Sequence, residues 1–239
     1  MTAGLVVSNL SAGYGDVAVL TDVSMSAEVG VITAVIGSNG AGKTTLLRSL
    51  SGLLTPRQGS IRIGDAELSG SKALDFVNAG IAHVPEGRRL FAGMTVEDNL
   101  LMGAFARAAA PAELRRDLDR IYVMFPKLAE RRRQDAVSMS GGEQQMCAIG
   151  RGLMSRPRIL MIDELSLGLS PVAVDFLVES LKTISSDGVG IVVVEQDVAV
   201  ALDLASHVVV MDRGRVSKAG SSSDIAQDRA IRAAYLGVD

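Results

Sequence analysis

The sequence is poor in the residues that several protein classes require. Its 239 residues include one cysteine, Cys147, two histidines, His83 and His207, and no tryptophan. A single cysteine excludes a disulfide scaffold and an all-cysteine metal cluster, and two histidines leave little for a histidine-based metal site. We therefore expect Cys147 to be a small buried hydrophobic residue and both histidines to be packing or strand-edge residues.

Charge and long apolar runs are also scarce. Charged residues make up 21% and the net charge is −3, which argues against a disordered chain and against a nucleic-acid binder that works by bulk electrostatics. No apolar run reaches the ~18 residues of a membrane span, and the N-terminus has no basic flank followed by an apolar stretch. A hydrophobic content of 48% suffices for a core, so we expect one reduced, intracellular, soluble α/β-type domain.

Short apolar runs predict two sheets. Four of them, at residues 31–36, 159–162, 191–194 and 208–211, predict buried strands, and three of the four are followed at once by a polar pair. Polar residues at the carboxyl ends of buried strands are typical of a parallel sheet with a site at that edge. Runs at 5–10, 20–27 and 60–63 alternate partially between glycine turns, which indicates a smaller antiparallel sheet beside the first.

The middle of the chain, approximately residues 86–150, is richer in charge and helix formers and predicts a helical insert. We therefore expect the segments at about 1–85 and 151–239 to form an α/β core with a mostly parallel central sheet and a side antiparallel subdomain. The charged run at 130–133 is expected to be a solvated face or loop.

A glycine-rich segment carries the first sign of chemistry. Residues 37–44, GSNGAGKT, satisfy the pattern G-x-x-x-x-G-K-[ST], and they lie between a predicted strand and a predicted helix. Such a loop wraps its backbone N–H groups around a phosphate, which the positive end of the helix also attracts. Lys43 can reach the outer phosphates, and the Thr44 hydroxyl suits Mg²⁺. The sequence thus predicts a nucleoside triphosphate site formed by Gly37, Ser38, Asn39, Gly40, Ala41, Gly42, Lys43, Thr44 and Thr45.

An acidic pair, Asp163 and Glu164, follows the apolar run at 159–162. Taken alone, such a pair is often only the start of a helix. Beside a phosphate-binding loop, one carboxylate can orient Mg²⁺ and the second can polarise an attacking water.

A third motif, SGGEQ at 140–144, precedes the acidic pair. Ser140 and Glu143 fit the capping box S-x-x-E, with apolar residues at helical spacing behind them. The motif is either a well-capped helix and nothing else, or a second anion site that receives phosphate from another subunit.

In this order, the three motifs resemble those of the ATP-binding subunits of ABC transporters, over essentially the whole chain. The resemblance implies that Tyr14 stacks on adenine, that Asp163 binds Mg²⁺ and that Glu164 is the general base. It also implies that Ser140, Gly141 and Gly142 close over the γ-phosphate of ATP held by an opposite subunit. Two cassettes would then sandwich two MgATP molecules head to tail. The partner cassette is expected to be a non-identical homologue, with a homodimer as the form available to the purified subunit alone.

Several positions depart from the general family pattern. Glu86 stands where a glutamine commonly contacts Mg²⁺ and the membrane partner, and Gln196 stands where a histidine is usual. A glutamine can donate a hydrogen bond to the γ-phosphate but cannot accept a proton as imidazole does. Leu165 and Ser170 replace a proline and an aspartate of the family in the loop after Glu164.

Most departures resemble one branch, the second ATP-binding subunit of high-affinity branched-chain amino-acid importers. The segments that carry this resemblance are PEGRR at 85–89, MSGGEQQ at 139–145, SLGL at 166–169, VEQ at 194–196, and Tyr235-Leu236-Gly237. It implies an ATP-hydrolysing subunit at the cytoplasmic face of the inner membrane, with permease subunits and, indirectly, an external solute-binding protein as partners. Urea and short-chain amide importers share much of this pattern, so the solute stays open.

Features of the sequence argue against two other classes of protein. A transport-independent soluble cassette protein acting on ribosomes or DNA would normally carry two cassettes or coiled-coil arms, and the length and acidic balance count against it. A P-loop kinase or small GTPase has no use for the serine-glycine turn at 140–142, and the chain has no guanine-reading N-K-x-D run. The apolar cluster at 90–94 is either part of a permease contact or plain core.

Overall fold

The computed structural model describes residues 4–233, so the predicted Tyr235-Leu236-Gly237 ending lies outside the described residues. A six-stranded sheet forms the centre, in the order β10-β9-β3-β8-β7-β6. All neighbours are parallel except the edge strand β10, which pairs antiparallel with β9. The strands are β3 (Ile32–Ile36), β6 (Ile81–Val84), β7 (Ile159–Asp163), β8 (Gly190–Glu195), β9 (His207–Asp212) and β10 (Arg215–Ser221). The predicted, mostly parallel α/β fold is confirmed.

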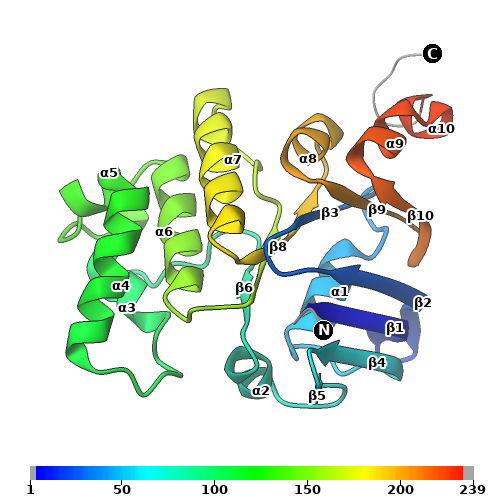
Figure 1. Ribbon diagram of the computed structural model, residues 1–239, viewed down its shortest axis with the longest axis horizontal. Helices are drawn as coiled ribbons and strands as arrows, with labels where there is room; N and C mark the ends of the chain where they lie inside the picture. The colour runs from blue at the N-terminus through cyan, green and yellow to red at the C-terminus, as the bar shows by residue number, and fades with distance from the viewer. Residues whose placement is uncertain (1–3, 234–239) are drawn as a thin grey trace.

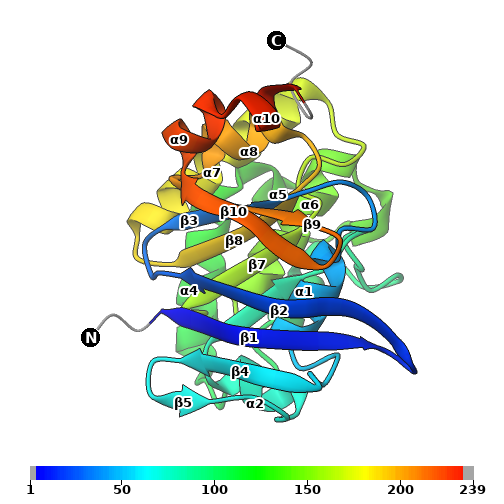
Figure 2. The ribbon, with the colours of Figure 1, turned by 90° about the vertical axis from the view of Figure 1, so that its right-hand side faces the viewer.

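A four-stranded antiparallel sheet, in the order β2-β1-β4-β5, packs below the central sheet, as Figure 2 shows. Its strands are β1 (Leu5–Tyr14), β2 (Val17–Ala27), β4 (Gln58–Ile63) and β5 (Ala66–Glu67). The three partially alternating runs of the sequence fall on β1, β2 and β4. Residues such as Leu5, Val7, Ile61 and Ile63 bury one face of this sheet while their neighbours stay exposed, which is the pattern of a one-sided antiparallel sheet.

Both faces of the central sheet are covered, which explains why its strands are continuous apolar runs. On one face, Val35, Met161 and Val192 pack with Leu46 and Leu47 of α1 (Lys43–Leu50), the helix between the two sheets. The other face packs against helices that Figure 1 shows above the sheet. These are α6 (Gly141–Leu153), α7 (Pro171–Ser186), α8 (Val198–Leu204) and α9 (Ser222–Gln227), followed by the short α10 (Arg229–Ile231).

A group of helices lies beside the sheet at the end far from the antiparallel layer (Figure 1). It comprises α3 (Val96–Met102), α4 (Pro111–Met124), α5 (Pro126–Glu130), a 3₁₀ turn (Ala136–Ser138) and the start of α6. The remaining helix, α2 (Ala73–Asn78), precedes β6. Cys147 of α6 is fully buried and both histidines lie on strands, as predicted. Between residues 4 and 233, no helix has the length and apolar character needed to cross a membrane.

His83 of β6 is buried beside α1. Its Nδ1 lies 3.2 Å from Ser51 Oγ, and within the described part of the chain its buried Nε2 has no hydrogen-bond partner. Burial, helped by the positive charge of Arg48, lowers the pKa of His83 to about 4. The pKa of an unfolded histidine is about 6.5. Between about pH 6.5 and pH 4, His83 is therefore protonated in the unfolded chain but neutral in the folded chain.

The folded protein should therefore lose stability as pH falls from about 6.5 towards 4. The protonation of His83 in the unfolded chain should by itself lower the free energy of unfolding by about 2 kcal/mol when the pH falls from 7.5 to 5. Urea unfolding of the wild type and of His83→Gln at both pH values measures this, and the variant should show a correspondingly smaller drop. Equal pH dependence in the two proteins would contradict this assignment.

Candidate nucleotide-binding site

The glycine-rich loop connects β3 to α1 and forms one wall of the site. Gly42, the N-cap of α1, has φ 101°, a conformation that L side chains rarely adopt, and an added Cβ would lie 2.8 Å from Leu20 Cδ2. Glycine has no side chain to cap the first N–H groups of α1, which leaves them available to an anion. The Lys43 side chain is buried, and its Nζ donates to Gly37 O at 2.8 Å and Ser38 O at 3.3 Å. The loop is thus folded around its own lysine.

A cavity of about 320 Å³ opens over this loop. Its walls come from the loop, the start of α1, and the segments that follow β6, β7 and β8 at their carboxyl ends. The residues that line it are Val19, Asn39, Gly40, Gly42, Lys43, Thr44, Thr45, Glu86, Glu164 and Gln196. All but Val19 are site residues predicted from the sequence, so the fold brings together side chains that are up to 157 residues apart (Asn39 to Gln196).

Thr44, which lines the cavity, brings a hydroxyl oxygen close to a buried carboxylate. Thr44 Oγ1 lies 3.4 Å from Asp163 Oδ1, and Asp163 is 2% exposed. Burial raises the pKa of Asp163 to about 6, and the nearby carboxylates of Glu164 and Glu86 add to the rise, while the Thr44 hydrogen bond opposes it. A hydroxyl and carboxylates are the ligands that Mg²⁺ prefers, and a buried carboxylate with one weak hydrogen bond fits a cation.

Glu164 follows β7 in a left-handed conformation, φ 56°, with its N–H donating to Val194 O at 3.0 Å. Its Oε1 accepts a hydrogen bond from Gln196 Nε2 at 2.9 Å. The second carboxylate of the acidic pair and the residue at the histidine position are therefore in direct contact. Together they present an oxygen acceptor and an amide to the cavity.

Glu195 is a functional candidate for which the sequence predicts no role. It is fully buried, and its carboxylate accepts from Ser166 N at 2.7 Å, Ser166 Oγ at 3.0 Å and Gln196 N at 3.1 Å. Burial raises the pKa of Glu195, while the bonds from Ser166 oppose the rise. This carboxylate ties the segment after Glu164 to the segment that carries Gln196. Its position in the VEQ segment was the available signal.

The two departures after Glu164 have structural uses. Leu165 is fully buried in the core that packs against α7. Ser170 is the N-cap of α7, and its Oγ accepts from Ala173 N. A leucine and a serine thus anchor this loop at both ends.

Tyr14, Gly37, Ser38, Ala41 and the buried Asp163 are not among the described residues that line the cavity. Gly37, Ser38 and Ala41 belong to the phosphate loop itself, whereas Tyr14 lies at the end of β1. It is 42% exposed, and its hydroxyl accepts from Arg48 Nη1 at 3.1 Å. Adenine stacking by Tyr14 stays a prediction.

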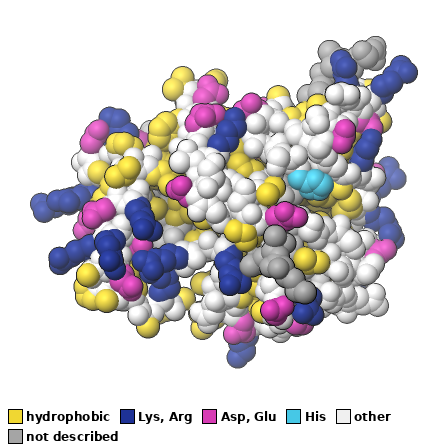
Figure 3. Space-filling model, in the orientation of Figure 1, with side chains coloured by type: hydrophobic (Ala, Val, Ile, Leu, Met, Phe, Trp, Pro, Cys, Tyr) yellow, Lys and Arg dark blue, Asp and Glu magenta, His cyan; other side chains and the backbone are white. Residues whose placement is uncertain are grey.

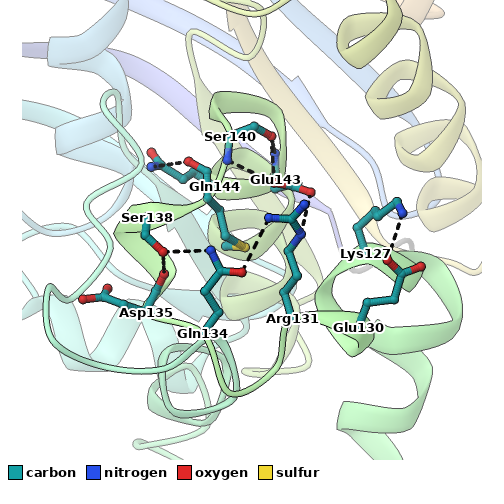
Figure 4. Close-up of polar contacts among 10 residues, drawn as sticks. Lys127, Glu130, Arg131, Gln134, Asp135, Ser138, Ser140, Glu143 and Gln144 are labelled. Atoms are coloured by element: carbon teal, nitrogen blue, oxygen red, sulfur yellow. Dashed lines mark hydrogen bonds and ion pairs between the residues drawn. The ribbon is translucent and has the colours of Figure 1, made fainter.

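The serine-glycine turn at residues 140–142 also contributes none of the described residues that line the cavity. The predicted capping box is confirmed, because Ser140 is the N-cap of α6 and exchanges hydrogen bonds with Glu143 (Figure 4). The turn is nevertheless tied to the loop that holds Glu86, since Arg88 Nη1 donates to Gln144 Oε1 at 3.2 Å. The Arg151 guanidinium fixes the same loop by donating to the carbonyls of Arg88 and Arg89.

Comparison with known proteins places these motifs in context. Residues 20–166 match the family model described as ABC transporter. The high-affinity branched-chain amino acid transport ATP-binding protein BraG of Pseudomonas aeruginosa is 42% identical over 228 residues, which cover 95% of this chain and 97% of BraG. The probable branched-chain amino acid transport ATP-binding protein LivF of Archaeoglobus fulgidus is 31% identical, over 96% of this chain and 97% of LivF.

Solved structures agree on the fold. An ATP-binding subunit of an ABC transporter superposes with a TM-score of 0.83 at 32% identity, covering 98% of this chain and 96% of the other. An ATP-binding cassette in its ADP conformation gives a TM-score of 0.85 at 23% identity over the full length of both chains, which shows the fold alone.

Proposed function

Because the chain belongs to the ATP-binding proteins of ABC transporters, and is thus an ATPase of that family, we propose that it powers an importer of branched-chain, hydrophobic amino acids. The observation that carries the solute class is the identity to BraG, 42% over nearly the full length of both chains. The VEQ and PEGRR segments that separate this branch from the general family pattern support it.

The geometry of the loop supports nucleotide binding at this site. The N–H groups of residues 38–44 and the positive end of α1 hold the β- and γ-phosphates, and Lys43 moves its Nζ from the carbonyls of Gly37 and Ser38 to phosphate oxygens. Thr44, Asp163 and Glu86 are the proposed Mg²⁺ ligands, directly or through water. The cation, when bound, neutralises phosphate charge.

The contact between Glu164 and Gln196 supports their roles in ATP hydrolysis. Glu164 accepts the proton of a water aligned with the γ-phosphate, and Gln196 keeps Glu164 Oε1 oriented through its 2.9 Å hydrogen bond. Gln196 can also donate to the γ-phosphate once ATP is bound. The Glu195 carboxylate accepts hydrogen bonds from Ser166 N and Gln196 N, and in this way it fixes the positions of Glu164 and Gln196 relative to each other.

A second cassette completes the site. Among the described residues, those that line the chain's own cavity do not include Ser140, Gly141 or Gly142. We therefore propose that these three residues face the γ-phosphate of ATP bound to a partner cassette. The partner in the complex is a non-identical homologue, and the subunit purified alone forms a homodimer when ATP is bound. Closure on ATP and reopening after hydrolysis would move the permease between inward- and outward-facing states.

The permease contact is proposed to include the apolar cluster at 90–94. The 45% exposure of Phe91 supports this contact, although Leu90 of the same cluster packs against the core. The Arg151 guanidinium carbon lies 5.2 Å from the Phe91 ring centroid. Phe105, between α3 and α4, is a second exposed aromatic residue, at 84%. This contact would hold the subunit on the cytoplasmic face of the inner membrane, with no nucleic acid involved.

Reconstitution tests the proposal. The chain, co-expressed with its permeases, partner cassette and solute-binding protein and placed in vesicles, should drive ATP-dependent uptake of leucine, isoleucine and valine. Phe91→Asp should still bind and hydrolyse ATP as an isolated subunit but should lose co-purification with the permease and most uptake.

Uptake of urea or short amides in place of leucine would contradict the solute class. Co-sedimentation with ribosomes, without a membrane partner, would contradict transport. Unchanged permease assembly of Phe91→Asp would remove the 90–94 cluster from the contact.

A further inference from the structure

The serine-glycine turn carries a negative charge of its own. Ser140 Oγ donates to Glu143 Oε2 at 2.8 Å, and Ser140 N donates to the same oxygen at 3.0 Å (Figure 4). The Glu143 side chain is 12% exposed. Burial opposes its ionisation, but the bonds from Ser140 and the positive charge of Arg131 outweigh that effect and lower the pKa of Glu143. A carboxylate therefore stands beside the turn that, under the proposed function, receives a partner's γ-phosphate.

One guanidinium compensates this carboxylate. Arg131, just after α5, places its Nε 3.1 Å from Glu143 Oε1, on the oxygen that Ser140 does not use. Its Nη1 lies 3.5 Å from Gln134 Oε1, and Gln134 Nε2 donates to Ser138 Oγ at 2.8 Å, so the pair is braced against the segment that leads into the turn (Figure 4). The other nearby cation, Lys127, is paired with Glu130 at 2.8 Å.

Pairing with Glu143 is a property of Arg131 and not of the charged run at 130–133 as a whole. Residues 130–133 are exposed, as predicted for a solvated face. Among the described residues, however, Arg133 has no ion pair, whereas Arg131 meets a residue twelve positions further along the chain. Figure 3 shows Lys and Arg side chains gathered over the end of the molecule formed by the helical group. A test of Arg131 must therefore distinguish its ion pair with Glu143 from the general positive potential of this surface.

We propose that Arg131 is a positioning residue for the nucleotide site of the partner cassette. It holds Glu143 on the N-terminal turn of α6 and offsets the repulsion between that carboxylate and the incoming triphosphate. The Ser140 hydroxyl can then turn from Glu143 Oε2 to a phosphate oxygen, while Arg131 keeps the carboxylate in place. This inference rests on the proposed head-to-tail pairing of two cassettes.

The test uses ATP-driven dimerisation in a Glu164→Gln background, together with ATP hydrolysis of the otherwise wild-type chain. Arg131→Gln should raise the ATP concentration for half-maximal dimerisation, and the KM for hydrolysis, by about five- to tenfold, with little change in kcat. ATP binding by the single chain should stay unchanged, because its own cavity is intact. Arg133→Gln, the same charge change in the same run, should shift both values less than about twofold.

A double-mutant cycle with Glu143→Gln tests the pair itself. The amide oxygen can still accept from Ser140 but carries no charge, so Arg131→Gln should have less than about a twofold effect in that background. Arg131→Lys, which restores the charge, should recover most of the affinity, whereas a purely structural defect would also change single-chain ATP binding and thermal stability.

An undiminished effect of Arg131→Gln in the Glu143→Gln background, or an equal effect of Arg133→Gln, would overturn this inference. Normal dimerisation of the Arg131→Gln protein would overturn it while leaving the proposed function standing. Failure of the Glu164→Gln protein itself to dimerise with ATP would instead overturn the head-to-tail pairing, and this inference with it.

Discussion

Replacing Glu164 with glutamine is expected to lower kcat for ATP hydrolysis by about two to four orders of magnitude while ATP still binds. The amide keeps the size of the side chain and can still contact Gln196. In the wild type, Gln196 Nε2 donates to Glu164 Oε1 at 2.9 Å. It cannot accept the proton of the attacking water. The phosphate loop, Thr44 and Asp163 are unchanged, so the affinity for ATP should be retained.

Phosphate release at saturating MgATP measures the first quantity, and equilibrium ATP binding measures the second. Glu179→Gln is the matched control, because Glu179 lies on α7 with its side chain 72% exposed and pairs with Lys182. It should hydrolyse ATP at the wild-type rate. A Glu164→Gln protein with wild-type kcat would show that another group activates the water.

Replacing Gly141 with aspartate should abolish ATP-driven dimerisation and lower hydrolysis more than about a hundredfold, while single-chain ATP binding persists. The new carboxylate would face a triphosphate in a desolvated interface, where like charges cost several kcal/mol. An added Cβ would meet Arg88 Nη2 at 3.2 Å and Leu169 Cδ2 at 3.4 Å, both ends of flexible side chains. The fold should therefore accommodate the change.

Gly141→Ala adds the same Cβ without the charge and controls for crowding. Its effect on dimerisation, followed by light scattering, should be much smaller than that of the aspartate. If the aspartate variant dimerises as well as the wild type, the turn does not contact the partner's nucleotide. Gly142 is less suitable as a probe, because a Cβ there would lie 2.9 Å from Ala173 Cβ within the same chain.

The elements that the sequence predicts best are those with a local cause. Strands β3, β7, β8 and β9 are apolar runs because both faces of the sheet are covered, and that apolar character alone predicts each of them. The phosphate loop and the capping box at Ser140 are equally local patterns. In contrast, β10 is an exposed, polar edge strand at residues 215–221, and no apolar run marks it.

The parts of the site that escaped prediction depend on contacts between distant segments. Glu195 and Ser166 are 29 residues apart, and only the parallel pairing of β7 and β8 brings their loops together. Arg131 belongs to a run of charges that has the composition of any solvated loop. Its contact with Glu143 arises because the chain turns back through the 3₁₀ turn before α6 begins.

The most direct test of the composite site is the mass of the Glu164→Gln protein in solution, measured by light scattering with and without MgATP. With nucleotide, we expect the mass of two chains and two bound ATP molecules, and without nucleotide the mass of one chain. ATP bound to a particle that keeps the mass of a single chain at every protein concentration would contradict the account.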